Sequence, residues 1–373
     1  MNMQSVTRMR AARLHEMHGS MVVEEVDVPT PGDEDVLVRV RSCGMVPNLV
    51  NVLRIFAELR PTNPLPPLPA IFGLDPAGEI VQVGAHVKGL SVGDRVYLNP
   101  MRVCNTCRHC VKGDYIACAH YTFNAYFGFT PKSKEMFERY RSGGYAEYMN
   151  APAYSAVKLP DSMSYDEAAR LGYIGTAYAG LRRAKVGPDS TVLINGASGT
   201  LGLGAVISAL ALGAKLVLGV ARDKELLEAV KAIAPHRIEV MSTLDGPIDD
   251  WVRGHAGEEG VDVAIDCLPT GAPFEQFLTG LDLVRRGGTM VNVGGVLAAV
   301  PIVIADMMAK GVTLIGSTWF DPWQAREMVA LAKSGLLDFA IFEHKVFDLE
   351  QIEKAMSSMS ARRGGFNNFV IHP

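Results

Sequence analysis

The amino-acid sequence predicts an α/β fold with a β-rich first region followed by a doubly wound parallel sheet. Up to about Tyr154, short apolar runs alternate with Gly, Pro and Asp, which is typical of strands joined by turns. After about Lys158, six apolar runs alternate with helical segments, the pattern of a parallel sheet with helices on both faces. A glycine-rich turn directly follows the first of these runs.

In the first region we expect strands at Val36–Val40, Gly78–Val83 and Asp94–Leu98, because each apolar run is bounded by turn-forming residues. Between them lies Pro61–Pro69, a proline-rich segment. Proline lacks the backbone N–H that regular structure needs, so this segment is expected to form an extended surface loop.

In the second region we expect six strands with helices between them. A buried helix is predicted at Leu201–Leu212, and Asp223–Ile233 has the apolar spacing of an amphipathic helix. After Phe320 the pattern becomes mixed, so the tail is expected to pack back on the first region. The predicted domain boundaries are 1–157, 158–318 and 319–373. The six predicted strands are Thr191–Asn195, Lys215–Val220, Arg237–Met241, Val261–Asp266, Thr289–Val293 and Val312–Ser317.

The bulk composition narrows the classes of function. The 373 residues are 48% hydrophobic and 20% charged, as in a globular protein long enough for two domains. A formal net charge of -4 gives no reason to expect nucleic acid or a membrane surface as partner. Glycines interrupt the uncharged stretch Thr191–Ala214, so no membrane span is expected. The first thirty residues hold no continuous apolar run typical of a secretory signal, which predicts a cytoplasmic protein.

Four cysteines, at Cys104, Cys107, Cys110 and Cys118, form a C-x2-C-x2-C-x7-C run. Four thiolates from so short a segment can close a tetrahedron around Zn2+ with no open position, which is the arrangement of a structural zinc site. A pair of disulfides and an iron–sulfur cluster are the alternatives. Six cysteines in the whole chain are too few for a disulfide scaffold, and no Pro follows the fourth cysteine, so one structural Zn2+ per chain is favoured.

The glycine-rich turn predicts a dinucleotide site. Its G-x-x-G-x-x-G spacing lies between a strand and a helix, where glycines permit a tight bend and the helix N-terminus offers N–H groups to a pyrophosphate. The alternative is a simple βα turn. The residues of the turn that we expect at the cofactor are Gly196, Ala197, Ser198, Gly199, Thr200, Leu201 and Gly202.

The end of the second strand of this region indicates which dinucleotide is preferred. Sites specific for NAD usually place Asp or Glu there to hold the ribose hydroxyls. Here Ala221 stands at that position with Arg222 beside it, a pair that suits a 2'-phosphate. We therefore expect NADP(H) to be preferred over NAD(H). In the alternative interpretation, Arg222 begins a solvated helix that Asp223 caps.

Taken together, the motifs resemble the medium-chain dehydrogenase/reductase superfamily, which includes zinc alcohol dehydrogenases and quinone reductases. The resemblance implies a GroES-like β-barrel catalytic domain made from both chain ends, an inserted Rossmann domain, and a homodimer or homotetramer. We also count Cys267, Val293 and Gly294 among the cofactor-binding residues, although Cys267, like Cys43, stands alone in an apolar run typical of a buried small side chain. Besides the cysteines and the glycine turn, the motifs are Arg39–Gly44, Gly73–Glu79, Val87–Val96, Gly143–Tyr148 and Arg286–Gly295.

The chain departs from this family at the catalytic zinc. Zinc-dependent members hold that ion with a Cys, a His and a later Cys or Asp, and these positions fall on Val46, Leu74 and Tyr173. Val and Leu cannot coordinate Zn2+, so no catalytic zinc is expected. The family's proton-relay Ser or Thr and His fall on Asn48 and Asn51.

Without the metal, the favoured chemistry is hydride transfer from NAD(P)H to a conjugated acceptor such as an enone, quinone or iminium, because one or two hydrogen-bond donors can stabilise the delocalised charge. Tyr173 and Asn48 are the candidate donors, and Tyr173 is a candidate proton donor if its pKa is lowered. The alternative for Tyr173 is an aromatic filler of the vacated cavity. Asp75 is a further candidate, for which a buried structural role is favoured over catalysis.

The aromatic segment Tyr121–Phe129 is expected either to line a pocket for an apolar or aromatic small molecule, or to pack the zinc lobe or a subunit contact. Two other functions stay open. One is an alcohol dehydrogenase, or a ketone or imine reductase, that uses Tyr and Asn donors. The other is an NADPH-binding protein without turnover.

Overall fold

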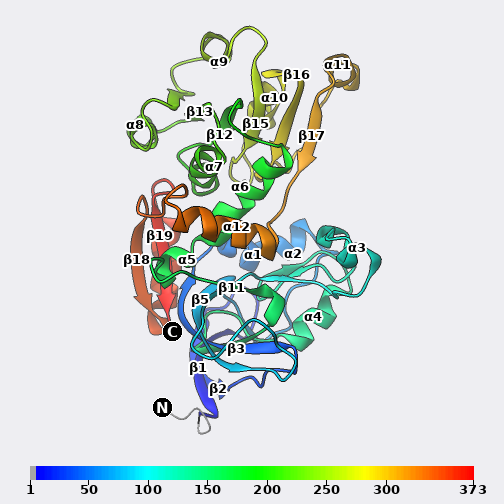
Figure 1. The fold of residues 1–373 in the computed structure, drawn as a ribbon, viewed down its shortest axis with the longest axis vertical. Helices are drawn as coiled ribbons and strands as arrows, with labels where there is room; N and C mark the ends of the chain where they lie inside the picture. Colours follow the sequence, from blue (N-terminus) through cyan, green and yellow to red (C-terminus); the bar gives the residue numbers. More distant parts are fainter. Residues whose placement is uncertain (1–5) are drawn as a thin grey trace.

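The computed structural model describes residues 6–373 and contains a parallel sheet at one end and a β-rich part at the other (Figure 1). The helices α6 (Leu171–Arg183) and α12 (Pro322–Lys333) lie between the two parts. The predicted domain boundaries stay predictions, and the first five residues of the predicted first domain lie outside the described residues.

The β-rich part is built around a sheet in the order β11-β6-β5-β3-β19-β18, with β10 also paired to β3. The predicted strands of this region are confirmed and are longer at β3 and β5. Two small sheets, β2-β1-β4 and β7-β8-β9, flank it. The strands are β1 (Arg8–Leu14), β2 (Met21–Asp27), β3 (Asp35–Gly44), β4 (Ala70–Ile71), β5 (Asp75–Val83), β6 (Arg95–Leu98), β7 (Met101–Arg102), β8 (Thr122–Phe123), β9 (Phe127–Gly128), β10 (Tyr148–Pro152) and β11 (Ala156–Lys158).

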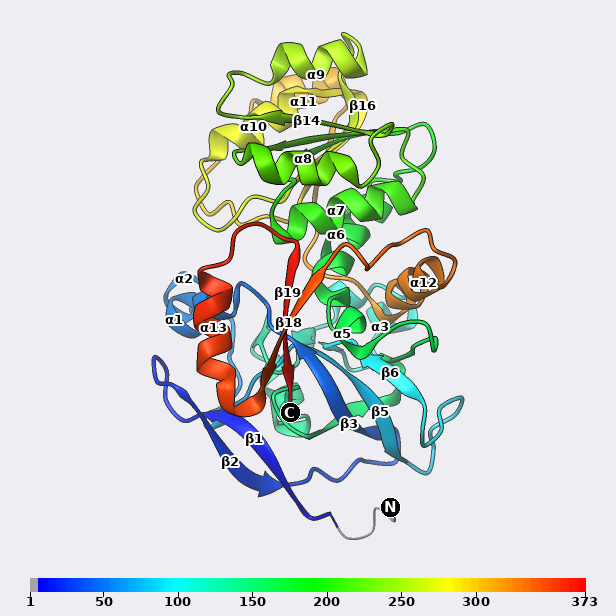
Figure 2. The ribbon, with the colours of Figure 1, turned by 90° about the vertical axis from the view of Figure 1, so that its left-hand side faces the viewer.

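The chain end returns to this sheet. β18 (Glu343–Asp348) runs parallel to β19 (Asn367–His372), and β19 pairs antiparallel with β3 through Val370 and Ile371. Between these two strands the chain forms α13 (Ile352–Ser360) and then a connection that rises toward α7 and α8 before β19 begins (Figure 2). This connection brings residues near the C-terminus against the parallel sheet domain.

The predicted six-stranded parallel sheet is confirmed, in the order β14-β13-β12-β15-β16-β17. The observed bounds differ from the predicted ones by one residue in most places. The main difference is β16, which begins five residues before the expected start because Val284 already pairs with Val261. The register then shifts, and Thr289 pairs with Val263. The strands are β12 (Thr191–Asn195), β13 (Leu216–Ala221), β14 (Ile238–Ser242), β15 (Val261–Asp266), β16 (Val284–Asn292) and β17 (Thr313–Gly316).

Both predicted helices of this region form. Asp223 caps α8 by accepting a hydrogen bond from the Leu226 N–H at 3.2 Å, as one interpretation of this residue anticipated. Pro61–Pro69 contains no helix or strand and is partly exposed, as predicted. The helices are α1 (Leu49–Arg54), α2 (Phe56–Leu59), α3 (Arg108–Val111), α4 (Ser133–Arg139), α5 (Tyr165–Ala168), α7 (Thr200–Ala211), α8 (Lys224–Ala232), α9 (Asp249–Ala256), α10 (Phe274–Asp282) and α11 (Ile304–Lys310), with short 3-10 turns at Tyr115–Ala117, Ala153–Ser155 and Leu349–Gln351.

Three apolar clusters form the core. One fills the β-rich part, and the other two cover the two faces of the parallel sheet. The helix α7 is apolar and nearly all buried, which its position against the sheet explains. Among the described residues, no helix combines the length and the apolar character needed to cross a bilayer.

Candidate functional site

A cavity of about 820 Å³ lies at the carboxyl ends of β12, β13 and β15. Its walls include Asn195, Val220 and Cys267, which stand at or just beyond the ends of these strands. β12 has β13 on one side and β15 on the other, so the cavity lies where the strand order reverses. This is the position at which doubly wound sheets bind dinucleotides.

The glycine turn forms part of the cavity wall. Gly196 has φ +78°, a conformation that favours glycine. A Cβ atom on Gly202 would lie 2.0 Å from the Gly196 carbonyl oxygen, so the close approach of α7 to the turn requires glycine. The N-cap of α7 is Gly199, which has no side chain to cap the first N–H groups. These donors, at the positive end of the helix, fit the pyrophosphate of a dinucleotide.

The structure separates the predicted cofactor residues into two groups. One group lines the cavity: Gly196, Ser198, Gly199, Ala221, Arg222 and Cys267. The other does not line it: Ala197, Thr200, Leu201, Gly202, Val293 and Gly294. Ala197 is fully buried, and a Cβ on Gly219 of β13 would lie 3.0 Å from its methyl group. Ala197 therefore packs the turn against the sheet. The assignment of these residues to the cofactor stays a prediction.

Several residues of the cavity wall were not predicted, and two of them come from a distant part of the chain. Arg363 and Gly364 come from the connection between α13 and β19 and line the cavity together with Arg222. Gly364 has φ +71°, and a Cβ on Gly365 would lie 2.5 Å from the Gly199 carbonyl oxygen. The two consecutive glycines therefore let this connection lie directly against the glycine turn, and they were the only sequence signal for it.

A second cluster of polar groups surrounds the three predicted metal-ligand positions. Val46 and Leu74 are each 2% exposed and carry no atom that could bind a metal. The third, Tyr173, lies in the first turn of α6, where its hydroxyl oxygen accepts a hydrogen bond from the Asn48 N–H at 3.2 Å. Asn51 in turn donates its side-chain N–H to Asn48 Oδ1 at 3.1 Å. The predicted donors Tyr173 and Asn48 are thus in contact.

Asp75 lies deep in this cluster. Its carboxyl group is 1% exposed and accepts a 2.7 Å hydrogen bond from the Tyr97 hydroxyl. Burial raises the pKa of Asp75 to about 7, although the Tyr97 hydroxyl and the Arg170 charge act in the opposite direction. A Cβ on Gly172 would lie 2.1 Å from Asp75 Oδ2, so the carboxyl group fits only because residue 172 is glycine.

The condition set for Tyr173 as a proton donor, a lowered pKa, is not met. Loss of contact with water raises its pKa to about 12, and the Asn48 N–H and the charges of Arg362 and Arg170 reverse only part of that shift. A phenol with this pKa stays protonated at neutral pH. Tyr173 is therefore suited to donate a hydrogen bond rather than to act as an acid of matched pKa.

Three further residues of this cluster escaped the sequence analysis. The hydroxyl groups of Tyr126 and Tyr145 are buried and have no hydrogen-bond partner among the described residues. The guanidinium of Arg170 is buried, lies 6.0 Å from the centre of the Tyr173 ring, and donates to the Gly365 carbonyl at 2.7 Å. Two of them lie in segments that the sequence analysis named, Tyr126 in the aromatic segment Tyr121–Phe129 and Tyr145 in the motif Gly143–Tyr148, but neither was singled out.

That aromatic segment packs largely against itself and its neighbours. The ring centres of Phe123 and Trp319 are 4.9 Å apart, and those of Phe127 and Phe56 are 4.5 Å apart. Such contacts stabilise the lobe around β8 and β9. This supports the packing interpretation of the segment, with the unpartnered hydroxyl of Tyr126 as its polar exception.

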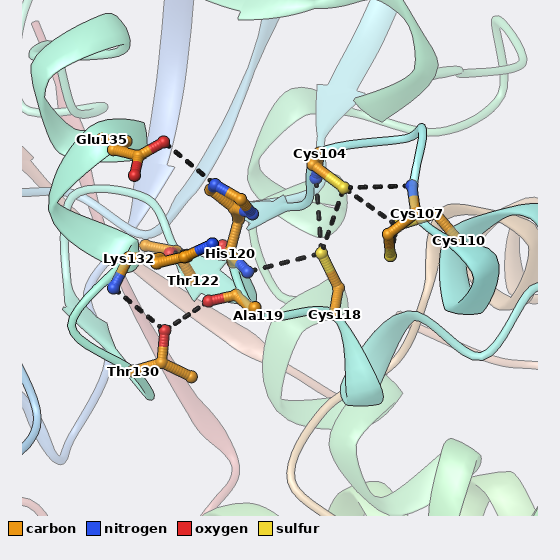
Figure 3. A network of polar contacts seen from close by, with 10 residues as sticks. All are labelled: Cys104, Cys107, Cys110, Cys118, Ala119, His120, Thr122, Thr130, Lys132 and Glu135. Atoms are coloured by element: carbon orange, nitrogen blue, oxygen red, sulfur yellow. Dashed lines mark hydrogen bonds and ion pairs between the residues drawn. The ribbon is translucent and has the colours of Figure 1, made fainter.

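The four predicted zinc ligands come together. Their sulfur atoms lie within 4.8 Å of one another and face a common centre (Figure 3). The distances are 3.6 Å for Cys107–Cys110 and Cys104–Cys118, and 3.9 Å for Cys104–Cys110. A tetrahedral site with Zn–S bonds of about 2.3 Å requires sulfurs about 3.8 Å apart, so the set fits zinc. The disulfide alternative is contradicted, because all four cysteines are free.

Neighbouring groups hold this loop in place. The N–H of Cys107 donates to the Cys104 sulfur at 3.4 Å, and the N–H of His120 donates to the Cys118 sulfur at 3.4 Å. The His120 ring lies 3.0 Å from Glu135 on α4 (Figure 3). Amide donors to sulfur favour the thiolate form that binds a metal.

Comparisons with known proteins agree with this arrangement. Residues 32–161 match the family described as alcohol dehydrogenase GroES-like domain, and residues 200–334 match the zinc-binding dehydrogenase family. The L-idonate 5-dehydrogenase of Vitis vinifera is 29% identical over 92% of this chain and 90% of its own. An uncharacterised zinc-type alcohol dehydrogenase-like protein of Escherichia coli is 30% identical over 92% and 93%.

Solved structures show the same fold. The crystal structure of AibC has a TM-score of 0.84, is 28% identical, and covers 100% of this chain and 98% of its own. A zinc-binding dehydrogenase from Sinorhizobium meliloti, solved with bound NADP, has a TM-score of 0.81 at 23% identity, covering 98% and 99%. The second likeness concerns the fold alone.

Proposed function

The chain belongs to the medium-chain dehydrogenase/reductase superfamily, with the zinc-type alcohol dehydrogenase-like proteins, and we propose that it transfers hydride from NAD(P)H to a conjugated acceptor without a catalytic zinc ion. The observation that carries this proposal is the replacement of metal donors by the buried apolar side chains of Val46 and Leu74. Alcohol oxidation in this superfamily relies on a metal to lower the pKa of the hydroxyl group. An enone, quinone or iminium needs no such assistance.

The nicotinamide, when bound, supplies the hydride. Tyr173 then has a defined task, because its oxygen accepts the Asn48 N–H and its own proton is left to donate to the acceptor oxygen. A pKa of about 12 keeps that proton in place. With an enone or quinone, the hydrogen bond stabilises the negative charge that reaches the oxygen when hydride adds to the conjugated system, and a proton from solvent completes the reduction. With an iminium, hydride addition gives a neutral amine directly.

For the cofactor we propose NADP(H) in preference to NAD(H). Ala221 and Arg222 line the cavity where an NAD-specific site would present an acid. A neutral side chain with a guanidinium beside it favours a 2'-phosphate. We assign the four cysteines to one zinc ion that stabilises their loop, since a closed four-cysteine site leaves no position for substrate.

A second function is favoured by the names of the relatives. One relative is named as a dehydrogenase of L-idonate, and another as alcohol dehydrogenase-like. The second candidate is therefore an alcohol dehydrogenase, or ketone or imine reductase, that uses the Tyr173 and Asn48 donors in place of the metal. Its substrate would be saturated at the carbon next to the reacting carbonyl or imine.

One assay separates these functions. Oxidation of NADPH and NADH is measured with enones, quinones, cyclic imines and saturated ketones, and zinc is counted by mass spectrometry. We expect turnover of conjugated acceptors and one zinc per chain. A second bound zinc would overturn the metal-free mechanism. Turnover of saturated ketones alone selects the second candidate, and cofactor binding without any turnover selects a non-catalytic role.

Tyr173→Phe tests the proposed donor. We expect kcat to fall about 100-fold with the conjugated acceptor, because the hydrogen bond to the developing charge is lost. Tyr178→Phe is the matched control, since Tyr178 lies on the same helix but donates to Glu327 on α12 at 3.1 Å. Equal rates for Tyr173→Phe and the unchanged protein would remove Tyr173 from the mechanism.

For the assembly we propose a homodimer or homotetramer. β17 is an edge strand of the parallel sheet, and α11 beside it exposes Ile304 and Met308 at 71% and 79%. An unpaired edge with exposed apolar side chains favours contact with a second copy. Light scattering after gel filtration should give two or four chains, and Ile304→Glu with Met308→Glu should shift the mass to one chain if this face is the contact.

A further inference from the structure

Arg363 forms three ion-pair contacts at the rim of the dinucleotide cavity. Its guanidinium donates to both carboxylate oxygens of Asp223, from Nε at 2.7 Å and from Nη2 at 2.8 Å. Its Nη1 lies 2.8 Å from Glu225 Oε2. Asp223 and Glu225 stand at the start of α8, whereas Arg363 arrives from the chain end 140 residues later. One cation is thus shared between two acids at the end of β13.

These charges lie where cofactor specificity is decided. Four charged side chains line the cavity, the cations Arg222 and Arg363 and the anions Asp223 and Asp249. Without Arg363 the balance would be one cation against two anions. In that state, Asp223 would stand two residues after Ala221 as an uncompensated acid, which favours ribose hydroxyls and repels a 2'-phosphate.

We propose that Arg363 is a specificity-determining residue, which makes the cavity selective for a 2'-phosphorylated dinucleotide by neutralising Asp223. The inference rests on the proposed preference for NADP(H) and adds the residue that permits it. Arg222 supplies the positive charge for the 2'-phosphate, and Arg363 removes the competing negative charge. Because the pair is bidentate, the Asp223 oxygens are turned toward Arg363 and away from a ribose hydroxyl.

Binding of four ligands to Arg363→Gln tests this role in the full-length protein. The ligands are NADPH, NADH, 2',5'-ADP and 5'-AMP, with dissociation constants from calorimetry. We expect the constants for NADPH and 2',5'-ADP to rise about five- to tenfold, because a half-exposed charge acts through partly screened electrostatics. The constants for NADH and 5'-AMP should stay within about twofold.

Two companion variants make the result decisive. Asp223→Asn in the Arg363→Gln background should restore most of the affinity for 2',5'-ADP, since the acid is gone and Asn still caps α8. Arg363→Lys should keep the selectivity of the unchanged protein. An equal loss for all four ligands would show that Arg363 only holds the connection in place, and an absent rescue would overturn neutralisation as the cause.

The same experiment separates this inference from the proposed cofactor preference. If the unchanged protein binds 2',5'-ADP no tighter than 5'-AMP, the preference for NADP(H) is wrong and the inference fails with it. If the unchanged protein prefers 2',5'-ADP and Arg363→Gln keeps that preference, only the role of Arg363 is overturned. Weaker selectivity in Arg222→Ala then assigns the specificity to Arg222 alone.

Discussion

Two clusters of side chains occupy positions that bind metal in the zinc-dependent members of the family. They differ in how far apart in the sequence their residues lie. The four cysteines come from one loop and keep four like donors at tetrahedral spacing. The other cluster draws Val46, Leu74 and Tyr173 from the loop after β3, the loop before β5 and the helix α6, with Asp75 and Asn48 beside them. There, hydrogen bonds between protein groups hold the polar side chains. We therefore expect the loop site to depend on a bound ion for its stability, and the distributed cluster to depend on packing and on hydrogen bonds between protein groups.

Removal of one cysteine should produce the largest effect. Cys110→Ala leaves three donors for a site that needs four, so we expect loss of zinc and a melting temperature lower by about 10 °C, because structural zinc contributes directly to folding. Differential scanning calorimetry with metal analysis measures both. Cys43→Ala is the control, since Cys43 is buried on β3, outside the four-cysteine loop, and should leave zinc at one per chain. Zinc retained at one per chain in Cys110→Ala would contradict this.

Asp75 should give the distributed cluster a pH-dependent stability. Its pKa is raised from 3.8 to about 7 by burial, so between these values the folded state keeps a proton that the unfolded chain has released. The free energy of unfolding should therefore fall by about 4 kcal/mol as the pH rises from 4 to 7, and then level off. Urea unfolding at several pH values measures this slope.

Asp75→Asn should remove most of that slope, because the amide does not titrate. A smaller slope of the same sign should persist from Asp266, whose pKa burial raises to about 6. If the slope of Asp75→Asn matches that of the unchanged protein, the Asp75 carboxyl group is ionised in the folded state throughout.

The features that could be predicted from the sequence are those formed by residues close together in the chain. The cysteine run, the glycine turn and the six parallel strands are local patterns, and all three appear in the structure. Arg363 and Gly364 could not be placed, because their position at the cavity depends on how the connection after α13 crosses to the other domain. The raised pKa of Tyr173 escaped for the same reason, since burial by distant segments causes it.

The smallest predicted effect concerns the hydroxyl groups of Tyr126 and Tyr145, which lie in the distributed cluster with no hydrogen-bond partner among residues 6–373. A buried hydroxyl without a hydrogen bond costs about 1–3 kcal/mol, and phenylalanine fills nearly the same space. We expect Tyr126→Phe to raise the melting temperature by about 2 °C. If the Tyr126 hydroxyl also faces the acceptor, kcat/KM should fall while the melting temperature rises. Tyr97→Phe is the control, because Tyr97 donates a hydrogen bond to Asp75 and its loss should not raise the melting temperature. A lower melting temperature for Tyr126→Phe would mean that its hydroxyl is bonded, and the distributed cluster would then be held by hydrogen bonds throughout.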